Sequence, residues 1–332
     1  PNDIFTAPEL RWAVIGCGVI ANQMAQSLAL AGRKLAGVAN RTLSKAQAFA
    51  EQYGIEKVYE TVEDLYADPD IDAVYITTPH NTHITYLRAA LAAGKHVLCE
   101  KAITLNSAEL DEARAIAAEH NVVLMDATTV LHMPLYQELR RRMDAGEFGR
   151  MNLAQLNFGS YKEYGDLTNR FYNRNLAGGA MLDIGVYALS VMRLFMASQP
   201  VEVVSLGNIC ETGVDVAGGI VCRNAEQQLG VVSLTLHSKQ PKRSVISFDN
   251  CYVEVNEYPR ADHATIVWTA DGHREEVAAG TEAYALCYEM ADLEQAVAGD
   301  DSKRELLDYA SDVMELMTKL RADWGVVYPE EE

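Results

Sequence analysis

One stretch near the start of the chain, residues 11–21, limits the fold more than any other. A short apolar run leads into a glycine pair, Gly16 and Gly18, and a helical pattern begins directly after it. This is the strand–turn–helix arrangement of a G-x-G-x-x-G/A dinucleotide site, with Ala21 in the last place. Gly16 permits a tight turn, Gly18 lets the backbone approach a pyrophosphate, and the N–H groups at the helix start attract the anion. A plain structural turn is the alternative. The expected dinucleotide contacts in this loop are Gly16, Cys17, Gly18, Val19 and Ile20.

The first part of the chain alternates short apolar runs with helical patterns. Strands are predicted at residues 11–15, 34–39, 58–59, 73–76, 96–99 and 122–125, with helices at 19–31, 44–53, 62–67, 84–93 and 108–120. Uninterrupted apolar runs such as residues 73–76 are typical of strands buried on both faces of a parallel sheet. The alternation therefore predicts an α/β fold, with an N-terminal NAD(P)-binding Rossmann domain (a doubly wound parallel sheet) over residues 1–130.

The pattern changes after residue 130, where strand candidates follow one another with few helices between them. Strands are predicted at residues 152–158, 201–209, 218–223, 230–237, 244–248, 252–255, 265–269 and 275–278, with helices at 135–145, 180–195, 283–298 and 304–321. This order predicts a C-terminal α+β domain with a large, mainly antiparallel open sheet over residues 131–332. The acidic tail, residues 329–332, is expected to be frayed.

Composition restricts the partners and the compartment. The formal net charge of -19 argues against nucleic acid or an anionic membrane as partner. No apolar run reaches the roughly 18 residues of a membrane span, and residues 1–5 lack the basic region of a secretory signal. The six cysteines show no C-x-x-C spacing, which indicates reduced thiols and no zinc site. We therefore expect a cytoplasmic protein that binds no metal.

The end of the second predicted strand bears on which dinucleotide binds. An acid that binds the ribose is expected about 20 residues past the glycines, but the chain has Asn40 and Arg41 there. The planar guanidinium of an arginine matches a phosphate group. Asn40 and Arg41 therefore favour NADP(H), with NAD(H) possible, unless Arg41 is simply a solvated loop residue.

Two further loops are candidates because the ligand crevice of an open α/β sheet lies at the carboxyl ends of its strands. The first follows the strand at residues 73–76, and its predicted cofactor contacts are Thr77, Thr78, Pro79, His80, Asn81 and His83. The second follows the strand at residues 96–99 and carries Glu100 and Lys101, also predicted to contact the cofactor. A capped turn and a surface ion pair are the structural alternatives.

A glycine-led helix in the second half carries Asp183 and Tyr187, which are four residues apart and therefore share one helix face. Gly178 and Gly179 are interpreted as letting the substrate or the nicotinamide come close, and Gly185 as letting neighbouring backbone do so. An amphipathic core helix with a buried tyrosine is the alternative.

Taken in order, these motifs resemble the glucose–fructose oxidoreductase/inositol dehydrogenase/MocA (Gfo/Idh/MocA) family. That family has a Gly-x-Gly-x-x-Ala opening, a Thr-Pro-(His/Asn)-x-x-His loop, an Ala-Gly-Lys-His-Val-x-x-Glu-Lys-Pro stretch and a Gly-Gly-(Ala/Gly)-x-x-Asp-x-Gly-x-(His/Tyr) element. This chain matches them from Gly16, Thr78, Ala93 and Gly178 onwards. Tyrosine at position 187 most resembles the dihydrodiol dehydrogenase branch, which includes xylose-dehydrogenase-like members.

The resemblance implies an NAD(P)-dependent oxidoreductase that transfers a hydride between nicotinamide and a hydroxyl or carbonyl carbon of a sugar, polyol or dihydrodiol-type substrate. The implied catalytic residues are Lys101, Asp183 and Tyr187. Lys101 can stabilise an oxyanion, Tyr187 can act as acid/base if Lys101 lowers its pKa, and Asp183 can orient Lys101 or bind a substrate hydroxyl. Which of Lys101 and Tyr187 moves the proton stays open. Candidate substrate contacts are Tyr161, Arg170, Tyr172 and Asn173. A homodimer or higher homo-oligomer through the C-terminal sheet is also implied.

The chain departs from the family pattern at two places. Ala102 follows Lys101 where the family has proline. A cis bond before a residue other than proline costs about 2.5–4 kcal/mol, so we expect a trans peptide or a visibly strained one. The family's Arg-Phe-x-Pro is replaced by a sequence containing His132 and Met133, which puts the substrate pocket in question. The competing hypothesis is a non-catalytic nucleotide-binding sensor or regulatory protein on the same fold.

Overall fold

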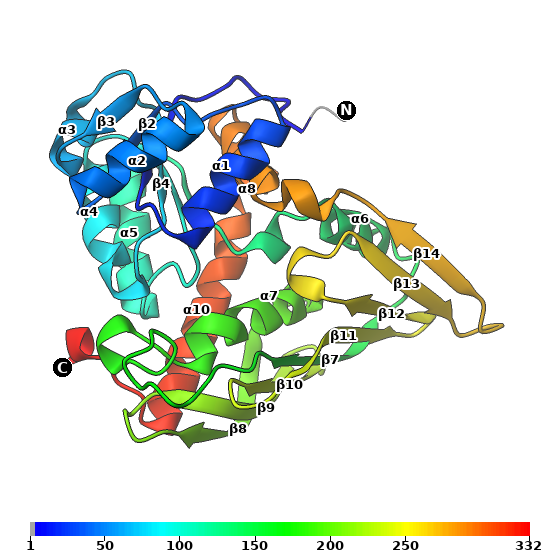
Figure 1. Ribbon diagram of the computed structural model, residues 1–332. Helices are drawn as coiled ribbons and strands as arrows, with labels where there is room; N and C mark the ends of the chain where they lie inside the picture. Colours follow the sequence, from blue (N-terminus) through cyan, green and yellow to red (C-terminus); the bar gives the residue numbers. More distant parts are fainter. Residues whose placement is uncertain (1–3) are drawn as a thin grey trace. The chain divides into compact units, whose positions relative to one another are not determined.

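The computed structural model describes residues 4–332, which fold into two compact units. Unit 1 contains the chain up to Ala127 together with Ala283–Asp308, and unit 2 contains Thr128–Glu282 together with Tyr309–Glu332 (Figure 1). Residues 1–3, which belong to the stretch used for the signal-peptide expectation, lie outside the described residues.

Unit 1 is built on a six-stranded parallel sheet with the order β3-β2-β1-β4-β5-β6. Its strands are β1 (Trp12–Ile15), β2 (Gly37–Ala39), β3 (Lys57–Tyr59), β4 (Ala73–Ile76), β5 (His96–Cys99) and β6 (Leu124–Asp126). Its helices are α1 (Val19–Leu30), α2 (Leu43–Tyr53), α3 (Val62–Ala67), η1 (His80–Thr82), α4 (His83–Ala92), α5 (Ser107–Glu119), α8 (Ala285–Val297) and α9 (Asp301–Arg304). All residues of β1 and β4 are buried, which explains their unbroken apolar sequences. The strand order reverses at β1 and β4, as in doubly wound dinucleotide-binding sheets, and the Rossmann prediction is confirmed.

Helix α8 joins unit 1 although it follows most of unit 2 in the sequence. Its apolar residues belong to the same buried core cluster as Met24 and Leu28 of α1. On its polar side, Glu294 accepts hydrogen bonds from the Trp12 indole at 3.0 Å and from the Arg33 guanidinium at 2.7 Å. The predicted second domain, residues 131–332, did not anticipate this return, because the order of elements does not reveal which core a late amphipathic helix covers.

Unit 2 is built on an eight-stranded sheet with the order β14-β13-β12-β11-β7-β10-β9-β8. The strands are β7 (Met151–Gly159), β8 (Pro200–Ile209), β9 (Asp215–Asn224), β10 (Leu229–Thr235), β11 (Gln240–Phe248), β12 (Cys251–Asn256), β13 (His263–Trp268) and β14 (Arg274–Ala278). The helices are η2 (Thr129–Leu131), α6 (Pro134–Asp144), η3 (Arg174–Leu176), the π-helical η4 (Met181–Gly185), α7 (Val186–Phe195), η5 (Tyr258–Arg260), α10 (Leu306–Trp324, within this unit from Tyr309) and η7 (Pro329–Glu331). Among the strands described, β10 and β7 pair in parallel and the other pairs are antiparallel, which confirms the predicted open sheet.

The two faces of the unit 2 sheet differ. Helix α7 packs on β7 and β10, and its residues are almost all buried. Elsewhere on the sheet, Val204 and Leu206 of β8 are 75% and 84% exposed, and Val221 of β9 is 45% exposed. The stretch Arg174–Phe195 is the one candidate among the described residues with the length and hydropathy of a membrane span, and 78% of its apolar window is buried within the fold.

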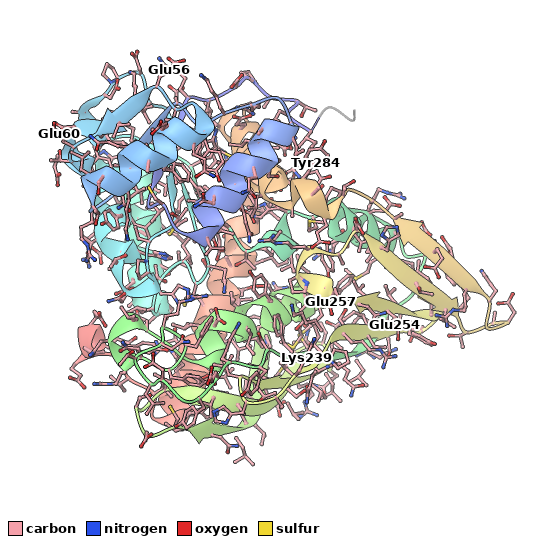
Figure 2. All side chains as sticks on the ribbon, in the orientation of Figure 1. Glu56, Glu60, Lys239, Glu254, Glu257 and Tyr284 are labelled. Atoms are coloured by element: carbon pink, nitrogen blue, oxygen red, sulfur yellow. The ribbon has the colours of Figure 1, made fainter. Side chains whose placement is uncertain are left out.

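The negative charge of the chain is carried largely by hydrated surface side chains. Glu56 and Glu60 project from unit 1, and Glu257 projects from unit 2 (Figure 2). Such exposed carboxylates keep their water shell and pay no desolvation penalty.

The C-terminal residues are ordered, so the prediction of a frayed tail is wrong. They form η7, in which the Tyr328 backbone and the Glu331 side chain make a capping box. Glu331 also pairs with Arg321 of α10 at 2.7 Å, and Glu332 pairs with Arg174. Tail position alone predicted fraying, but these long-range charge pairs hold the backbone.

Candidate active site

The two glycines of the glycine-rich loop in unit 1, Gly16 and Gly18, have different surroundings. Gly16 has a φ of +102°, and a Cβ there would lie 2.5 Å from the Thr77 Oγ1 atom. Its N–H donates to the Ala39 carbonyl at 2.9 Å. A Cβ at Gly18 would meet nothing within 4 Å. Gly16 therefore meets a steric and backbone requirement of the fold, whereas Gly18 faces open space that the phosphates of a ligand can enter.

Helix α1 begins at this open side of the loop. Its N-cap is Gly18, which supplies no side-chain cap, and its first turn carries no acidic residue. The first N–H groups of a helix have no intrahelical partner, and the helix dipole adds partial positive charge there. Val19 in this turn is exposed and Ile20 is half-buried. The residues present thus fit the pyrophosphate of a dinucleotide.

Two cations follow the second strand. Arg41 and Lys45 are both exposed, and within residues 4–332 neither is paired with a carboxylate. The Asn40 amide donates to the Thr42 carbonyl at 3.0 Å, which shapes the loop before α2. Burial raises the pKa of the Cys17 thiol to about 11, and the Lys45 ammonium acts in the opposite direction. Lys45 therefore lies close to the nucleotide loop. Sequence reasoning missed it, although its position one helical turn after Arg41 was the available signal.

The loop after β4 is tied to the rest of the sheet edge. The Thr77 hydroxyl donates to the Ile15 carbonyl at 2.9 Å, which joins this loop to the end of β1. The Thr82 hydroxyl donates to Thr78 Oγ1 at 2.7 Å. The other predicted contacts in this loop have accessible surface: Pro79 is exposed, and His80 and Asn81 are half-buried.

His83 is placed differently from the prediction. Its ring is completely buried; Nδ1 lies 2.8 Å from the Ala102 carbonyl and Nε2 lies 2.8 Å from the Thr78 carbonyl. Burial lowers the pKa of the imidazole. His83 therefore joins the Thr78 loop to the loop that carries Lys101, and we assign it a positioning role in place of the predicted cofactor contact.

Glu100 and Lys101 follow β5 at the same carboxyl edge of the sheet. Glu100 is buried, accepts a hydrogen bond from the Tyr75 hydroxyl and accepts the Lys101 N–H at 3.2 Å. Burial raises the pKa of Glu100 to about 7, against the opposing effects of Tyr75 and Lys101. Lys101 is half-buried. Its peptide bond to Ala102 is cis, so of the two alternatives expected from the sequence the trans bond is wrong. Local preference favours trans, but the Ala102 carbonyl also contacts the His83 ring.

In unit 2, Asp183 lies in the π-helical turn η4 and Tyr187 lies in the first turn of α7. Asp183 is buried and Tyr187 is half-buried. Single π-helical turns inside α-helices are frequent at functional sites. The Tyr187 ring stacks on Phe158 of β7, with centroids 6.0 Å apart and an interplanar angle of 19°. Sequence reasoning missed Phe158, because a strand aromatic is ordinarily a core residue.

A cation and an acid extend the stack beyond Phe158. The Lys242 ammonium lies 5.1 Å from the centroid of the Phe158 ring. It also lies 3.6 Å from the carboxylate of Glu257, whose side chain Figure 2 labels. Phe158 therefore contacts both Tyr187 and Lys242 within unit 2.

The four predicted substrate contacts have separate fates. Tyr161 is 62% exposed, and Arg170 reaches to 3.9 Å from the Asp183 carboxylate. Tyr172 is fully buried, and its hydroxyl donates to the Lys162 carbonyl at 2.8 Å. The Asn173 side chain caps η3. Tyr172 and Asn173 therefore hold the loop together, whereas Tyr161 and Arg170 have the exposure that a substrate contact needs.

At the glycines before Asp183, protein atoms occupy the space that a Cβ would fill. A Cβ at Gly178 would lie 2.7 Å from the carbonyls of Arg170 and Phe171, and one at Gly179 would lie 2.4 Å from Asp215 Oδ1. A Cβ at Gly185 would lie 2.9 Å from Met181 Sδ, 3.0 Å from Leu234 Cδ1 of β10 and 3.6 Å from the Ala180 carbonyl, so side chains come closer there than neighbouring backbone does. Glycine marks a close approach, but the residue type does not say what approaches.

No cluster of three or more His, Cys, Asp or Glu side chains that could hold a metal ion occurs among the described residues.

Both units match known families. Residues 10–128 match the model described as "Oxidoreductase family, NAD-binding Rossmann fold" (GFO_IDH_MocA), and residues 136–254 match the "GFO/IDH/MocA C-terminal domain". The chain belongs to the GFO/IDH/MocA oxidoreductase family. The resemblance seen in the sequence is thereby confirmed.

Relatives and solved structures agree with this membership. Trans-1,2-dihydrobenzene-1,2-diol dehydrogenase from Mus musculus is 33% identical over 72% of this chain and 72% of its own. The enzyme of that name from Xenopus laevis is 28% identical over 96% of this chain and 99% of its own. Among solved structures, the 3-ketoreductase KijD10 from Actinomadura kijaniata, with NADP and TDP-benzene, has a TM-score of 0.79 at 25% identity and covers 95% of this chain and 98% of its own. Levoglucosan dehydrogenase with NADH and levoglucosan has a TM-score of 0.80 at 20% identity over 94% and 97% of the two chains, which shows the shared fold.

One departure from the GFO/IDH/MocA pattern falls in the core. His132 and Met133 are both buried, with exposures of 1% and 0%. These residues follow η2, which packs on α7. Both replacements of the family residues are therefore at buried positions directly after η2.

Proposed function

We propose that this chain is an NADP(H)-preferring dehydrogenase or reductase that acts on a CH–OH group of a dihydrodiol or sugar-like substrate. The observation that carries the proposal is Lys101 at the carboxyl end of β5, on the same sheet edge as the open loop at Gly18. A dinucleotide held by that loop extends along this edge of a doubly wound sheet. The dihydrodiol dehydrogenases among the relatives support the substrate class.

The proposed mechanism assigns each step to a side chain. A nicotinamide held at this sheet edge would supply the chemistry of hydride transfer at the carbinol carbon. The hydroxyl proton must leave as the carbonyl forms, and a positioned acid/base contributes roughly 10²–10⁴-fold. Tyr187 accepts this proton in our proposal, Lys101 stabilises the developing oxyanion with its ammonium, and Asp183 binds a substrate hydroxyl. Buried Glu100, bonded to the Lys101 N–H, holds the backbone that carries Lys101.

Substitution tests these roles directly. Lys101→Met is expected to abolish turnover while NADP binding, followed by fluorescence titration, stays within about twofold. Tyr187→Phe is expected to lose roughly 10²-fold or more in kcat. Turnover is measured on a panel of candidate substrates, namely trans-1,2-dihydrobenzene-1,2-diol, aldoses, polyols and dicarbonyls, each with NADP(H) and with NAD(H). Wild-type turnover by Lys101→Met on a substrate from this panel contradicts the assignment. Binding of NADP without turnover on any substrate of the panel favours a sensor in place of an enzyme.

The preference for NADP(H) rests on Arg41 and Lys45, two exposed cations unpaired within the described chain. A charge-assisted contact contributes about 1.5–3 kcal/mol. We therefore expect Arg41→Ala to raise the Kd for NADP by roughly 10–100-fold and to leave the Kd for NAD nearly unchanged. Arg274→Ala, at an exposed position of β14 in unit 2, is the matched control. An equal loss for both dinucleotides refutes a phosphate-specific role.

We also propose a homo-oligomer formed through the exposed apolar residues of β8 and β9. Val204, Leu206 and Val221 lie on neighbouring strands, and such a patch is characteristic of protein interfaces. Light scattering tests this directly. A mass of 36.6 kDa, that of one chain, contradicts the proposal. In an oligomer, Leu206→Glu is expected to shift the mass to the monomer value.

A further inference from the structure

The C-terminal end of the chain is bonded to the glycines that begin the Asp183 helix. Tyr328 is fully buried, and its hydroxyl donates to the Gly178 carbonyl at 2.5 Å. Figure 1 shows η7, in red, beside the green loop that leads into η4. The guanidinium of Arg321 lies 4.6 Å from the Tyr328 ring centroid and donates to both oxygens of Glu331. We call Arg321, Tyr328 and Glu331 the C-terminal clamp.

A carboxylate from the sheet holds the same helix start from another direction. Asp215, at the beginning of β9, is fully buried, and its Oδ2 accepts the Met181 N–H at 2.6 Å. A carboxylate at a helix N-terminus satisfies an unpaired N–H and matches the helix dipole. Desolvation raises the pKa of Asp215 to about 6, while its backbone hydrogen bonds and the charge of Arg321 lower it. Asp215 and the clamp are thus coupled through Arg321.

The segment between these anchors is not fixed by local sterics; the Gly178 and Gly179 N–H groups donate to the Asn173 and Phe171 carbonyls. Gly178 and Gly179 are adjacent, and Gly179 has a φ of +124°. Glycine has the widest choice of backbone angles, so two in succession leave the entry into a helix undetermined by local sterics. The Gly179 carbonyl accepts the Asp183 N–H at 3.3 Å. The orientation of the Gly179 peptide therefore directly affects the position of Asp183.

We propose that the C-terminal clamp is a positioning device that sets the direction of the turn carrying Asp183 and the helix carrying Tyr187. The inference rests on the proposed roles of these two residues in catalysis. Arg321 is 2% exposed, and burying a guanidinium is expensive unless it is fully paired. In the C-terminal clamp, Glu331 pairs with this buried guanidinium, and the Tyr328 hydroxyl holds the Gly178 carbonyl.

The test compares two tyrosines that make the same bond in the same unit. Tyr328→Phe removes the hydrogen bond to the Gly178 carbonyl. Tyr136→Phe removes an equivalent buried bond to the Tyr258 carbonyl, 2.7 Å long. Both are expected to lower thermal stability by similar amounts. Only Tyr328→Phe is expected to lower kcat, by roughly tenfold, because small displacements of reacting groups are costly.

Hydrogen exchange supplies a readout that does not depend on the reaction. The Met181 and Asp183 amides are expected to exchange about tenfold faster in Tyr328→Phe than in wild type, and at the wild-type rate in Tyr136→Phe. The Kd for NADP is expected to stay unchanged in both variants. If Tyr328→Phe does not fold, Glu331→Gln decides the question, since it removes the carboxylate charge that pairs with Arg321 and keeps Tyr328.

The outcomes separate this inference from the proposed function. Equal kcat and equal amide exchange in the two tyrosine variants overturn the clamp, whatever Asp183 and Tyr187 do. Faster exchange in Tyr328→Phe, with wild-type turnover in Asp183→Asn and Tyr187→Phe, leaves the clamp in place as a structural device and refutes the proposed active site. Faster exchange with a selective fall in kcat supports both.

Discussion

The two loop glycines should fail in different ways when each is replaced by alanine. At Gly16, with φ +102°, an alanine costs about 1–2 kcal/mol in backbone strain. Its Cβ, 2.5 Å from Thr77 Oγ1, also displaces that hydroxyl from the Ile15 carbonyl, which costs about 1 kcal/mol more. Gly16→Ala is therefore expected to lose about 2–3 kcal/mol, or roughly 5–10 °C in Tm.

Gly18→Ala is the matched partner. Its φ of -78° suits alanine, and its Cβ meets nothing within 4 Å, so stability should fall by about 1 kcal/mol or less, for the weaker N-cap. If the pyrophosphate approaches this backbone, the added methyl group should weaken NADP binding by at least about tenfold. Thermal unfolding without ligand and fluorescence titration with NADP measure the two effects. A Gly16→Ala variant as stable as wild type, or a Gly18→Ala variant that binds NADP normally, refutes the reasoning.

Three further substitutions test other parts of the structure. The pKa of Glu100 in the folded protein is about 7, against an ordinary 4.5, so folding favours the protonated carboxyl. The free energy of unfolding is therefore highest below about pH 4 and falls as the pH rises through 7. Glu100→Gln, which is neutral at every pH, should remove a decline of roughly 2–3 kcal/mol between pH 5 and pH 8, measured by denaturant unfolding. Arg33→Ala leaves the buried Glu294 carboxylate without its ion pair and should lower the free energy of unfolding by about 3 kcal/mol. Adding Glu294→Gln should partly restore it. A single variant as stable as wild type contradicts this. Gly218→Ala places a Cβ 2.4 Å from the Trp324 ring and should lower Tm, an effect that a second change, Trp324→Leu, reduces.

The sequence predicted the parts of the fold that depend on local patterns. The alternation of apolar runs and helices predicts the doubly wound sheet, because parallel strands must be buried on both faces. The positions of Arg41 and Lys101 at strand ends follow from the same rule, since all carboxyl ends of a parallel sheet share one edge. Such inferences need only the periodicity of one segment at a time.

What failed depends on contacts between distant segments. His83 has the spacing of a ligand contact, but it is enclosed by the carbonyls of Thr78 and Ala102. Gly178 and Gly179 have the freedom to admit a ligand, but protein atoms occupy the space beside them. The ordered tail depends likewise on ion pairs with Arg174 and Arg321. Residue type shows which contacts are possible, and only the tertiary structure selects among them.

The return of α8 to unit 1 has a consequence for how the chain is made. A ribosome adds about 5–20 residues per second, so residues 128–282, which separate the two parts of unit 1, take roughly 8–30 s to synthesise. During that time the surface of α1 formed by Met24 and Leu28 lacks the helix that covers it in the finished core. The N-terminal part emerges first yet completes its core last. A nascent chain stalled before residue 283 should therefore expose this apolar surface and recruit chaperones, whereas one released after residue 308 should not.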